Sequence, residues 1–392
     1  MKKWVGIVAA AVCISLMAGC TTSKPPPQQA LPATPLDGWV RVATPLSAAS
    51  GLIQVNVSPN GRYIVYETTE VRPGDTDAHP NQSNLYLLDR STGDYHLIRD
   101  WLADTWDVTD DGRVLVTYQE NTFTESHYAI YTIPGGLGTP FDRPPGSCDI
   151  RLEEGGTGLE LLCRGNGTEP AGIYRFDPGD TDATPVQVTV GLSDDMKVRG
   201  NSPNRRYLLI GSNQTDATWV YDDQTDTLLP FTIDQPLTLP INVTQHHLGG
   251  AVFDDGRRLI TSLVWGTNLD AVHTGWYDPR TGTIEYMSNY GAASIGDAIA
   301  GTDYLVLTDY TREIGRHYEF DERATNDKDT DTILGTFSSP TTRWLLPYQS
   351  GVLAVTADDD IIVQSTQPLD PNDTSPGIGI YVREGPLPPP PA

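Results

Sequence analysis

The strongest constraint on the fold of this chain is a short motif that recurs roughly every 50 residues along most of its length. The motif is an alternating apolar segment, a tight turn and a second alternating apolar segment. Its clearest copies are Val55–Tyr66, Trp106–Val116, Gly200–Ile210 and Ala251–Ile260. Looser copies are centred on Gly155-Gly156, Gly301–Asp303 and Asp358–Asp360. Apolar alternation on both sides of a turn rich in Asn, Asp or Gly predicts a β-hairpin.

A second motif follows most copies of the first and predicts another hairpin. It is a strand that ends in Asp, a short polar turn and a further strand, as in Tyr86–Gly93 and Trp276–Gly282. Related copies are Tyr174–Asp177, Val220–Asp226 and Tyr318–Asp321. The Asp side chain can accept a backbone hydrogen bond in such a turn, and Gly suits its left-handed position.

Two successive hairpins make one four-stranded unit. The units begin at Ser58, Thr109, Glu153, Ser202, Phe253, Ala300 and Ala357, at intervals of 44 to 57 residues. Seven such units without a convincing helical stretch predict an all-β fold, a seven-bladed β-propeller of four-stranded antiparallel blades. A parallel β-helix is the alternative, but its repeats are shorter and more regular.

The turns of the first motif resemble those of a known group of propellers. Ser58–Arg62 and Ser202–Arg206 are similar to the Ser-Pro-Asp-Gly-Arg turn of TolB-type and WD-repeat-like β-propellers. The resemblance covers about residues 39–385 and implies the propeller fold and a protein partner in the cell envelope. It implies little about activity, because such propellers host unrelated functions.

The last unit lacks a fourth strand. Its expected strands lie near Val352–Ala357, Ile361–Ser365 and Ile378–Arg383, and no other strand is expected before Pro386. The segment Trp39–Ala43 precedes the first unit and has no other expected partner. We therefore predict that Trp39–Ala43 supplies the missing strand and closes the ring, which brings both ends of the propeller to one rim.

Residues 1–19 have the pattern of a bacterial lipoprotein signal peptide. Lys2 and Lys3 precede the apolar run Val5–Met17, which is too short for an ordinary membrane span. The following Ala18-Gly19-Cys20 resembles a lipobox and implies that Cys20 is acylated, with palmitate among its acyl chains. Two or more acyl chains anchor a protein stably. We therefore expect an extracytoplasmic protein that is anchored to a bacterial lipid bilayer.

Pro-rich segments flank the expected propeller, which spans residues 38–385. Residues 20–37 form the expected tether, and residues 386–392 form a Pro-rich tail. The chain carries 26 Lys and Arg against 51 Asp and Glu, a formal net charge of −25. This charge excludes a nucleic-acid binder that works by neutralising phosphates. The expected state is a monomer.

Cys148 and Cys163 are expected to form a disulfide. Cys13 lies in the signal peptide and Cys20 carries the expected lipid, so the other two remain in a compartment that permits disulfides. With the turn centred on Gly155-Gly156, Cys148 and Cys163 are directly opposite each other across one hairpin. Opposed Cβ atoms lie about 4.5–5.5 Å apart, close to the separation that a disulfide requires.

The sequence contains no specific catalytic motif. It has no Gly-x-Ser-x-Gly turn, no His-Glu-x-x-His pair and no Gly-rich phosphate loop. The entrance of the propeller channel is therefore the expected ligand site. Residues just ahead of the turns combine an aromatic side chain with charges of both signs, which suits a glycan or a peptide: Trp106, Lys197, Arg199, His247 and Asp297.

One acidic segment has the spacing of a calcium loop. Asp327, Asp329 and Asp331 alternate with other residues, as calcium ligands do in such loops. The match is incomplete, because Thr332 stands where Gly is needed and Ser338 where a bidentate Glu belongs. Calcium is therefore a weak candidate, a solvated acidic hairpin is the alternative, and no other cofactor is expected.

These observations predict a membrane-anchored lipoprotein that acts as a non-enzymatic binding scaffold for a protein or another ligand in the cell envelope. The alternatives are a propeller enzyme, such as a glycoside hydrolase or lactonase, and a calcium-stabilised surface protein. A catalytic ring should gather several carboxylates or a metal at one channel mouth. A scaffold should instead present aromatic and apolar patches on a rim.

Overall fold

The fold is taken from a computed structural model of the chain. The structure describes residues 34–35, 37–43, 55–69, 71–72, 74–78, 82–100, 103–119, 126–141, 148–164, 171–179, 186–188, 192, 196–212, 218–230, 243–264, 271–287, 299–300, 304–309, 331–336, 343–345, 350–356, 360–365, 368–374 and 378–385. The expected signal peptide and Pro-rich tail lie outside these residues. Within them, no helix is long and apolar enough to span a membrane.

The described strands form seven sheets, numbered here in chain order. Sheet 1 contains β3 (Val55–Val57), β4 (Tyr63–Thr68), β5 (Asn84–Asp89) and β6 (Asp94–Asp100). Sheet 2 contains β7 (Ala103–Val108), β8 (Val114–Gln119), β9 (Ser126–Thr132) and β10 (Gly136–Leu137). Sheet 3 contains β11 (Cys148–Leu152), β12 (Leu159–Cys163), β13 (Gly172–Phe176) and β14 (Val186–Gln187).

The next two sheets have the same consecutive antiparallel order. Sheet 4 contains β15 (Met196–Asn201), β16 (Tyr207–Ser212), β17 (Thr218–Asp222) and β18 (Thr227–Pro230). Sheet 5 contains β19 (Val243–Val252), β20 (Arg258–Val264), β21 (Ala271–Asp278) and β22 (Thr283–Met287). All of these pairings are antiparallel, which contradicts the parallel β-helix alternative.

The last two sheets each recruit a strand from the N-terminal part of the chain. Sheet 6 contains β23 (Ile299–Ala300), β24 (Tyr304–Asp309), β25 (Asp331–Thr336), β26 (Arg343–Leu345) and the parallel strand β1 (Thr34–Pro35). The sequence assigned residues 34–35 to the tether. Pro35 lacks an N–H but is tolerated here because β1 is an edge strand. Sheet 7 contains β27 (Ser350–Val355), β28 (Ile361–Ser365), β29 (Gly379–Arg383) and β2 (Val40–Ala43).

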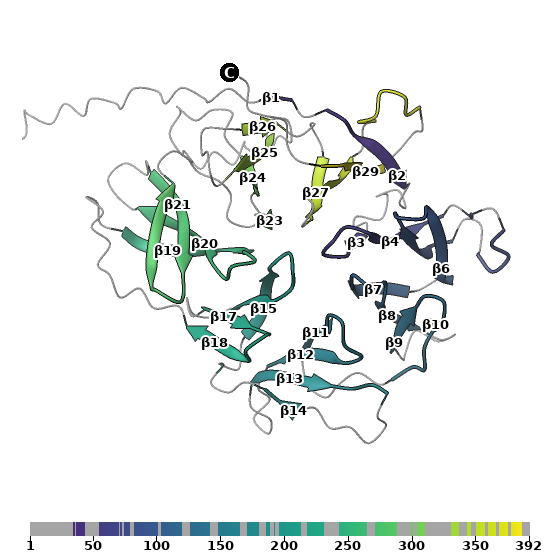
Figure 1. Cartoon of the computed structure of the whole chain (residues 1–392), viewed down its shortest axis with the longest axis horizontal. Coiled ribbons are helices and arrows are strands. Elements are labelled where there is room, and N and C mark those ends of the chain that lie inside the picture. The colour runs from purple at the N-terminus through teal and green to yellow at the C-terminus, as the bar shows by residue number, and fades with distance from the viewer. Residues whose placement is uncertain are drawn as a thin grey trace, which may run out of the picture.

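The sheets are arranged as a propeller around a central axis (Figure 1). The strands nearest the axis include β3, β7, β11, β15, β23 and β27, and the sheets follow one another around it in chain order (Figure 1). Contacts continue around the ring from β3 to β7, and from β15 through β19, β23 and β27 back to β3. The chain is therefore an all-β propeller of four-stranded antiparallel blades.

Closure by the N-terminal strand is confirmed. Strand β2 pairs antiparallel with β29, in the register Val40 to Val382 and Arg41 to Tyr381. The backbone carbonyl of Asp37, just before β2, accepts a hydrogen bond of 3.2 Å from Arg383, so the two ends of the ring meet at one place.

The turn of the first motif is stabilised by the side chain at its first position. In sheet 1 the Ser58 N–H donates to the carbonyl of Tyr63 at 2.9 Å, and the Ser58 hydroxyl accepts from the Tyr63 N–H at 3.0 Å. Ser202 and Tyr207 make the same two bonds in sheet 4, at 2.8 and 3.0 Å. Gly61 takes the left-handed conformation, with φ of 72°, at little cost. The motif therefore forms the tight hairpin turn that the sequence predicts.

The Asp of the second motif joins the two hairpins of a sheet. As predicted, Asp89 accepts a backbone hydrogen bond, from the Ser91 N–H at 2.9 Å. The same carboxylate accepts two hydrogen bonds from Arg62 of the first motif, at 3.0 and 2.7 Å. The Arg62 guanidinium holds the pKa of Asp89 well below its usual range. Arg206 and Asp222 repeat this bidentate pair in sheet 4.

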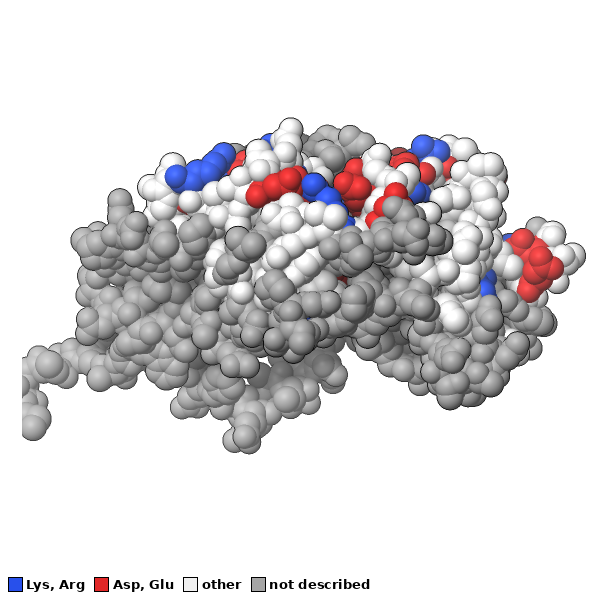
Figure 2. All heavy atoms as spheres, turned by 90° about the horizontal axis from the view of Figure 1, so that it is seen from below, with Lys and Arg blue, Asp and Glu red and all other residues white. Residues whose placement is uncertain are grey.

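Such pairs shape one face of the ring. In the side view of Figure 2, basic and acidic side chains of the described residues lie next to one another along one face. Three ion pairs of the described residues lie within turns: Arg113–Asp111, Arg257–Asp255 and Arg280–Asp278. This face therefore presents paired charges of both signs.

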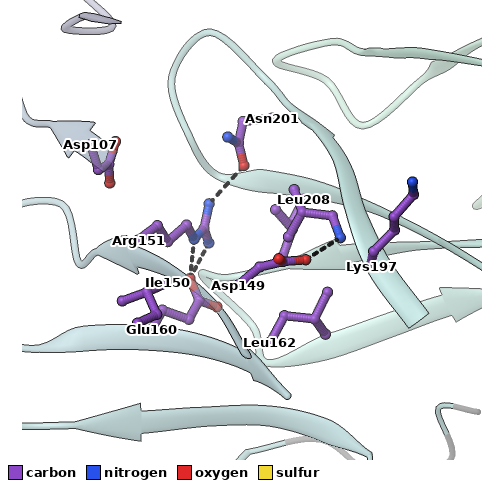
Figure 3. Close-up of a pocket in the computed structure, with 10 residues that line it drawn as sticks. Asp107, Asp149, Ile150, Arg151, Glu160, Leu162, Lys197, Asn201 and Leu208 are labelled. Carbon is purple, nitrogen blue, oxygen red and sulfur yellow. Dashed lines mark hydrogen bonds and ion pairs between the residues drawn. The ribbon is translucent and has the colours of Figure 1, made fainter. Parts of the chain in front are cut away.

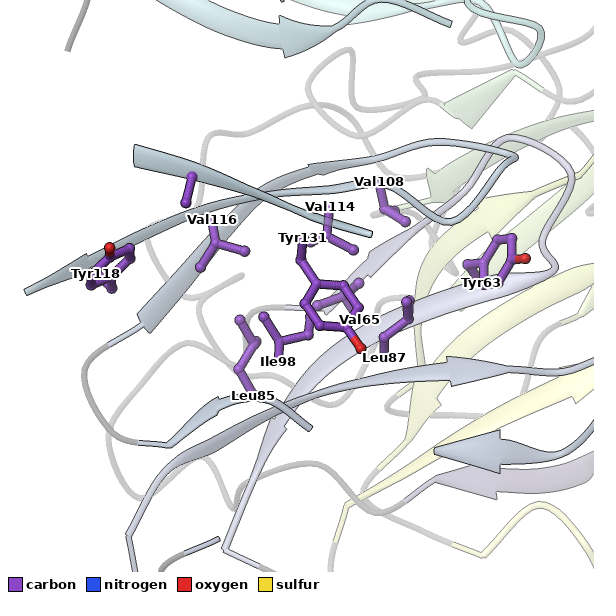
Figure 4. Close-up of a cluster of buried hydrophobic side chains, with 11 residues drawn as sticks. Tyr63, Val65, Leu85, Leu87, Ile98, Val108, Val114, Val116, Tyr118 and Tyr131 are labelled. Atoms are coloured by element: carbon purple, nitrogen blue, oxygen red, sulfur yellow. The ribbon is translucent and has the colours of Figure 1, made fainter. Parts of the chain in front are cut away.

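The core lies between neighbouring sheets. Because a sheet on each side covers it, all six residues of β5 are buried, not only the alternate ones. Figure 4 shows the cluster between sheets 1 and 2, which contains Tyr63, Val65, Leu85, Leu87, Ile98, Val108, Val114, Val116, Tyr118, Ala129 and Tyr131. Apolar contact of this kind is the main force that holds one blade against the next.

The predicted disulfide is confirmed. Cys148 and Cys163 are directly opposite in the β11–β12 register and are bonded to each other, with their Cα atoms 4.0 Å apart. The register runs on to Leu152 opposite Leu159, as the turn position predicted. A cross-link that closes a loop of 15 residues contributes about 3 kcal/mol in the chain-entropy model. It fastens the innermost strand of sheet 3 to its neighbour.

Candidate binding site

Two of the five predicted channel-mouth side chains, Lys197 and Arg199, lie in the described part of the structure. Lys197 lies in β15, half-buried, in the wall of a cavity. Arg199 is exposed on the same strand, at a bulge between Val198 and Gly200. The backbone of Trp106 lies at a bulge in β7 and that of His247 pairs with Thr261, but their side chains are outside the described part of the structure. Asp297 is also outside it.

The weak calcium candidate is only partly described. Asp331 begins β25, where its backbone pairs with Asp309, whereas Asp327 and Asp329 lie outside the described residues. Among the residues that the structure does describe, no group of three or more His, Cys, Asp or Glu side chains is arranged to hold a metal ion.

A cavity of about 310 Å³ lies between sheets 3 and 4, near their inner strands (Figure 3). Its charged and polar lining comes from Asp107, Asp149, Arg151, Glu160, Lys197 and Asn201. Its apolar lining comes from Ile150, Leu162, Val198 and Leu208. The cavity thus has the size and mixed lining of a small-molecule site.

Glu160 is the unusual residue of this cavity. The repeats can be aligned on the residue whose backbone carbonyl accepts the hydrogen bond that closes the turn of the first motif. In sheet 3 this residue is Gly158, which accepts from the N–H of Glu153. Two residues later sheet 3 has Glu160, which is 4% exposed. At the same position four other sheets have apolar residues that are 0–1% exposed: Val65, Leu115, Leu209 and Ile362. Among these five sheets, only sheet 3 has a charged residue at this position.

The residues that pair with Glu160 on the two neighbouring strands are charged as well. Glu160 is opposite Arg151 on β11 and Arg175 on β13. On the strand that corresponds to β13, the matching partners in the other four sheets are Leu87, Ile130, Val220 and Val382. Glu160 and Arg175 therefore stand where these sheets pack apolar side chains, and with Arg151 they form a charged row, Arg151–Glu160–Arg175, across sheet 3. The residues that correspond to Arg151 in the other four sheets are Asn56, Asp107, Gly200 and Ala354.

The charged row is held in place by sheet 4. Arg151 forms a buried ion pair with Glu160 and also donates to the side chain of Asn201 at 3.3 Å and to the carbonyl of Arg205 at 3.2 Å. Burial raises the pKa of Glu160, although Arg151 opposes this effect. One carboxylate oxygen of Glu160, Oε1, is buried without a hydrogen-bond partner among the described residues.

Arg205 ties three sheets together beside the cavity. It occupies the turn position at which Gly61 stands in sheet 1, and its φ of 62° is unfavourable for a residue with a side chain. Its guanidinium pairs with Asp107 of sheet 2 and, at 3.3 Å, with Glu154 of sheet 3. Burial lowers the pKa of Arg205 to about 10. These contacts compensate for the strained turn.

Two further side chains link neighbouring sheets through backbone groups. Asp107 accepts the N–H of Leu152 at 2.7 Å, and Asp149 accepts the N–H of Val198 at 3.1 Å. The second bond crosses the cavity wall from sheet 3 to sheet 4 and is drawn in Figure 3. The polar lining is thus organised by contacts between sheets.

Comparisons with known proteins bear on the fold alone. No protein-family model matches the sequence, and a search of curated proteins finds no relative. The chain is similar in structure to the β-propeller domain of Cps50 (Swd1) from Myceliophteria thermophila, with a TM-score of 0.43 and 8% identity over 88% of this chain and 98% of that chain.

Two other solved structures show comparable similarity. The β-propeller domain of the trilobed protease from Pyrococcus furiosus has a TM-score of 0.41 and 10% identity, over 72% of this chain and 78% of that chain. A eukaryotic initiation factor has a TM-score of 0.38 and 12% identity, over 84% of this chain and 75% of that chain. Similarities this low carry no argument about function.

Proposed function

We propose that the chain is a monomeric, lipid-anchored, extracytoplasmic propeller of seven blades that acts as a non-enzymatic binding scaffold in the cell envelope. The observation that carries the binding role is the charged row of sheet 3. Glu160 lies at a position where four other described sheets have buried apolar residues, and it lines a cavity together with its ion-pair partner Arg151. Buried charges carry a desolvation cost that apolar residues avoid, and a preorganised ligand site would explain why this sheet has them.

The count of seven blades is supported by the strand order. The described strands fall into seven sheets, and each sheet matches one of the seven sequence units. The last sheet borrows β2, which is the closure that a ring of seven units requires.

The anchor is supported by the sequence and fits the ring closure. Cys20 follows an apolar run and lies a short Pro-rich segment ahead of β2. A tether that begins at Cys20 therefore ends at β1 on the edge of sheet 6, a few residues before the strand β2 that closes the ring. This arrangement would hold the propeller near the bilayer surface.

The anchor is tested by replacing Cys20 with serine. The variant should lose incorporation of labelled palmitate and move from the membrane fraction to the soluble fraction, since its acyl chains provide the attachment. Replacement of Cys13 by serine is the matched control and should leave both properties unchanged. If the Cys20→Ser protein stays in the membrane fraction without lipid label, another attachment holds it there.

An enzyme of the glycoside hydrolase or lactonase type is the second candidate, and one observation favours it. Glycoside hydrolysis uses two carboxyl groups, one with a raised pKa. The cavity wall contains Glu160, whose pKa is raised by burial, and Asp149.

A turnover assay separates the two candidates. We expect no turnover of a panel of glycosides, lactones and peptides, because Arg151 and the N–H of Val198 already engage the two carboxylates as structural groups. A rate that the purified chain supports and that Glu160→Gln or Asp149→Asn abolishes would establish the enzyme instead.

A further inference from the structure

We propose that the cavity between sheets 3 and 4 binds a small zwitterion of the amino-acid class, with the ligand's ammonium group at Glu160 and its carboxylate at Lys197. The assignment rests on the binding role proposed above and specifies its ligand. It follows from three properties of the cavity: a buried acceptor and a cation that each have no partner among the described residues, and apolar lining between them.

The acceptor is Oε1 of Glu160. The other oxygen of this carboxylate is engaged by Arg151, whereas Oε1 is buried and has no hydrogen-bond partner within the described residues. A buried polar group without a partner is costly, and few are found in folded proteins. A ligand that donates a charged N–H to Oε1 would remove this cost.

The cation is Lys197. No hydrogen bond or ion pair connects its side chain to any other residue that the structure describes, although it is half-buried and lines the same cavity. The other cations near the cavity differ in this respect, because Arg151 is paired with Glu160 and Arg205 with Asp107. Lys197 is therefore available to a ligand carboxylate.

The two groups are separated across the site. Figure 3 shows Lys197 on one side and Glu160 on the other, with Asp149 and Leu162 between them. Asp149 adds a second acceptor on the acidic side, and Leu162 and Leu208 provide apolar surface. The arrangement matches a small molecule that carries both a positive and a negative group, as a free amino acid does.

Other ligand classes fit less well. A dianion would place negative charge against Glu160, Asp149 and Asp107, and a simple cation would leave Lys197 unpaired. A neutral polyol carries no charge and would neutralise neither Glu160 nor Lys197. A zwitterion satisfies the acceptor and the cation together, which is why the proposal commits to it.

The test is isothermal titration of the purified full-length chain in detergent with each of the twenty free amino acids. At least one should bind, and its carboxamide and its N-acetyl form should each bind about tenfold more weakly or worse, because each loses a charged hydrogen bond. No binding by any free amino acid, or equal binding of all three forms, would overturn the proposal.

Two variants assign the ends of the ligand. Lys197→Met should weaken binding of the free amino acid about tenfold and remove the preference for the carboxylate over the carboxamide. Glu160→Gln, which keeps the shape of the side chain, should remove the preference for the free amine over the N-acetyl form. Arg199→Met is the control on the same strand, with the same change in charge outside the cavity, and should bind like the parent.

Circular dichroism must show that each variant is folded as the parent is. Binding that Lys197→Met and Glu160→Gln leave intact would place the ligand elsewhere and overturn this assignment. The result of this binding test is independent of whether the proposed scaffold function is correct. Turnover of a substrate would refute the scaffold, whereas a chain without turnover that ignores amino acids would refute only the ligand class.

Discussion

Replacement of Glu160 by leucine, with Arg151 retained, is expected to lower the free energy of unfolding by about 3–5 kcal/mol. Leucine has a similar volume and restores the apolar character that Val65, Leu115 and Leu209 have at this position. Apolar burial alone would therefore predict a gain in stability. The loss is expected because Arg151, which is 9% exposed, would be left buried without its carboxylate partner.

A double variant separates the ion pair from the packing. Arg151→Asn with Glu160→Val copies the pair that Asn56 and Val65 form in sheet 1. It should recover most of the stability that Glu160→Leu loses, because both charges are removed together and no buried charge is left without its partner. Urea denaturation measures the free energy of unfolding of the single and the double variant. A single variant as stable as the parent would show that the pair is unimportant to the fold.

Deletion of Trp39–Ala43 should destabilise the ring by about 5 kcal/mol or more. It removes the buried Trp39, which is 4% exposed, and truncations of buried Trp cost about 3–5 kcal/mol. It also removes the ion pair of 2.7 Å between Arg41 and Asp373, whose side chains are 10% and 5% exposed. The edge of β29 would lose its partner and become a site for aggregation.

The melting temperature and light scattering on heating measure these effects. Deletion of residues 386–392 is the control for a change of similar length at the opposite end of the chain, and it should leave the melting curve unchanged. If the 39–43 deletion melted like the parent without aggregation, β2 would be dispensable and some other contact would close the ring.

Local pairing makes much of the fold predictable from the sequence. The turn residues Asn60-Gly61 fix where a hairpin reverses, and the reversal fixes which residues face each other. The same reasoning about the turn at Gly155-Gly156 correctly places Cys148 opposite Cys163. The missing strand of the last unit is predictable because a propeller blade needs a partner for its open edge.

The charged row is not visible when each unit is read alone. In Leu159–Cys163, Glu160 alternates with apolar residues and looks like the solvent side of a half-buried strand. Middle strands of this fold are covered on both sides by neighbouring blades, so the glutamate is buried. Alignment of the units on their turns reveals the difference, because Val65 and Leu115 occupy the same position.

The candidate ligand site is predicted only in part for a related reason. The residues just ahead of the turns are expected at the channel entrance, but successive residues of a strand point to opposite sides. Lys197 and Arg199, two residues apart, would then lie on the same side, but Lys197 lines the cavity while Arg199, the extra residue of the bulge between Val198 and Gly200, is exposed. Register shifts of this kind depend on backbone bulges, which the residue pattern does not specify.

The position of the closing strand also sets the order of events during synthesis. Val40 is made early, but its partner Val382 is added 342 residues later. At about 5–20 residues per second, the ribosome needs roughly 20–70 s to cover that distance. Throughout this interval β2 has no β29 to pair with, and the last blade remains open. A chain that terminates before β29 could not complete the ring, so closure requires synthesis to have passed Arg383.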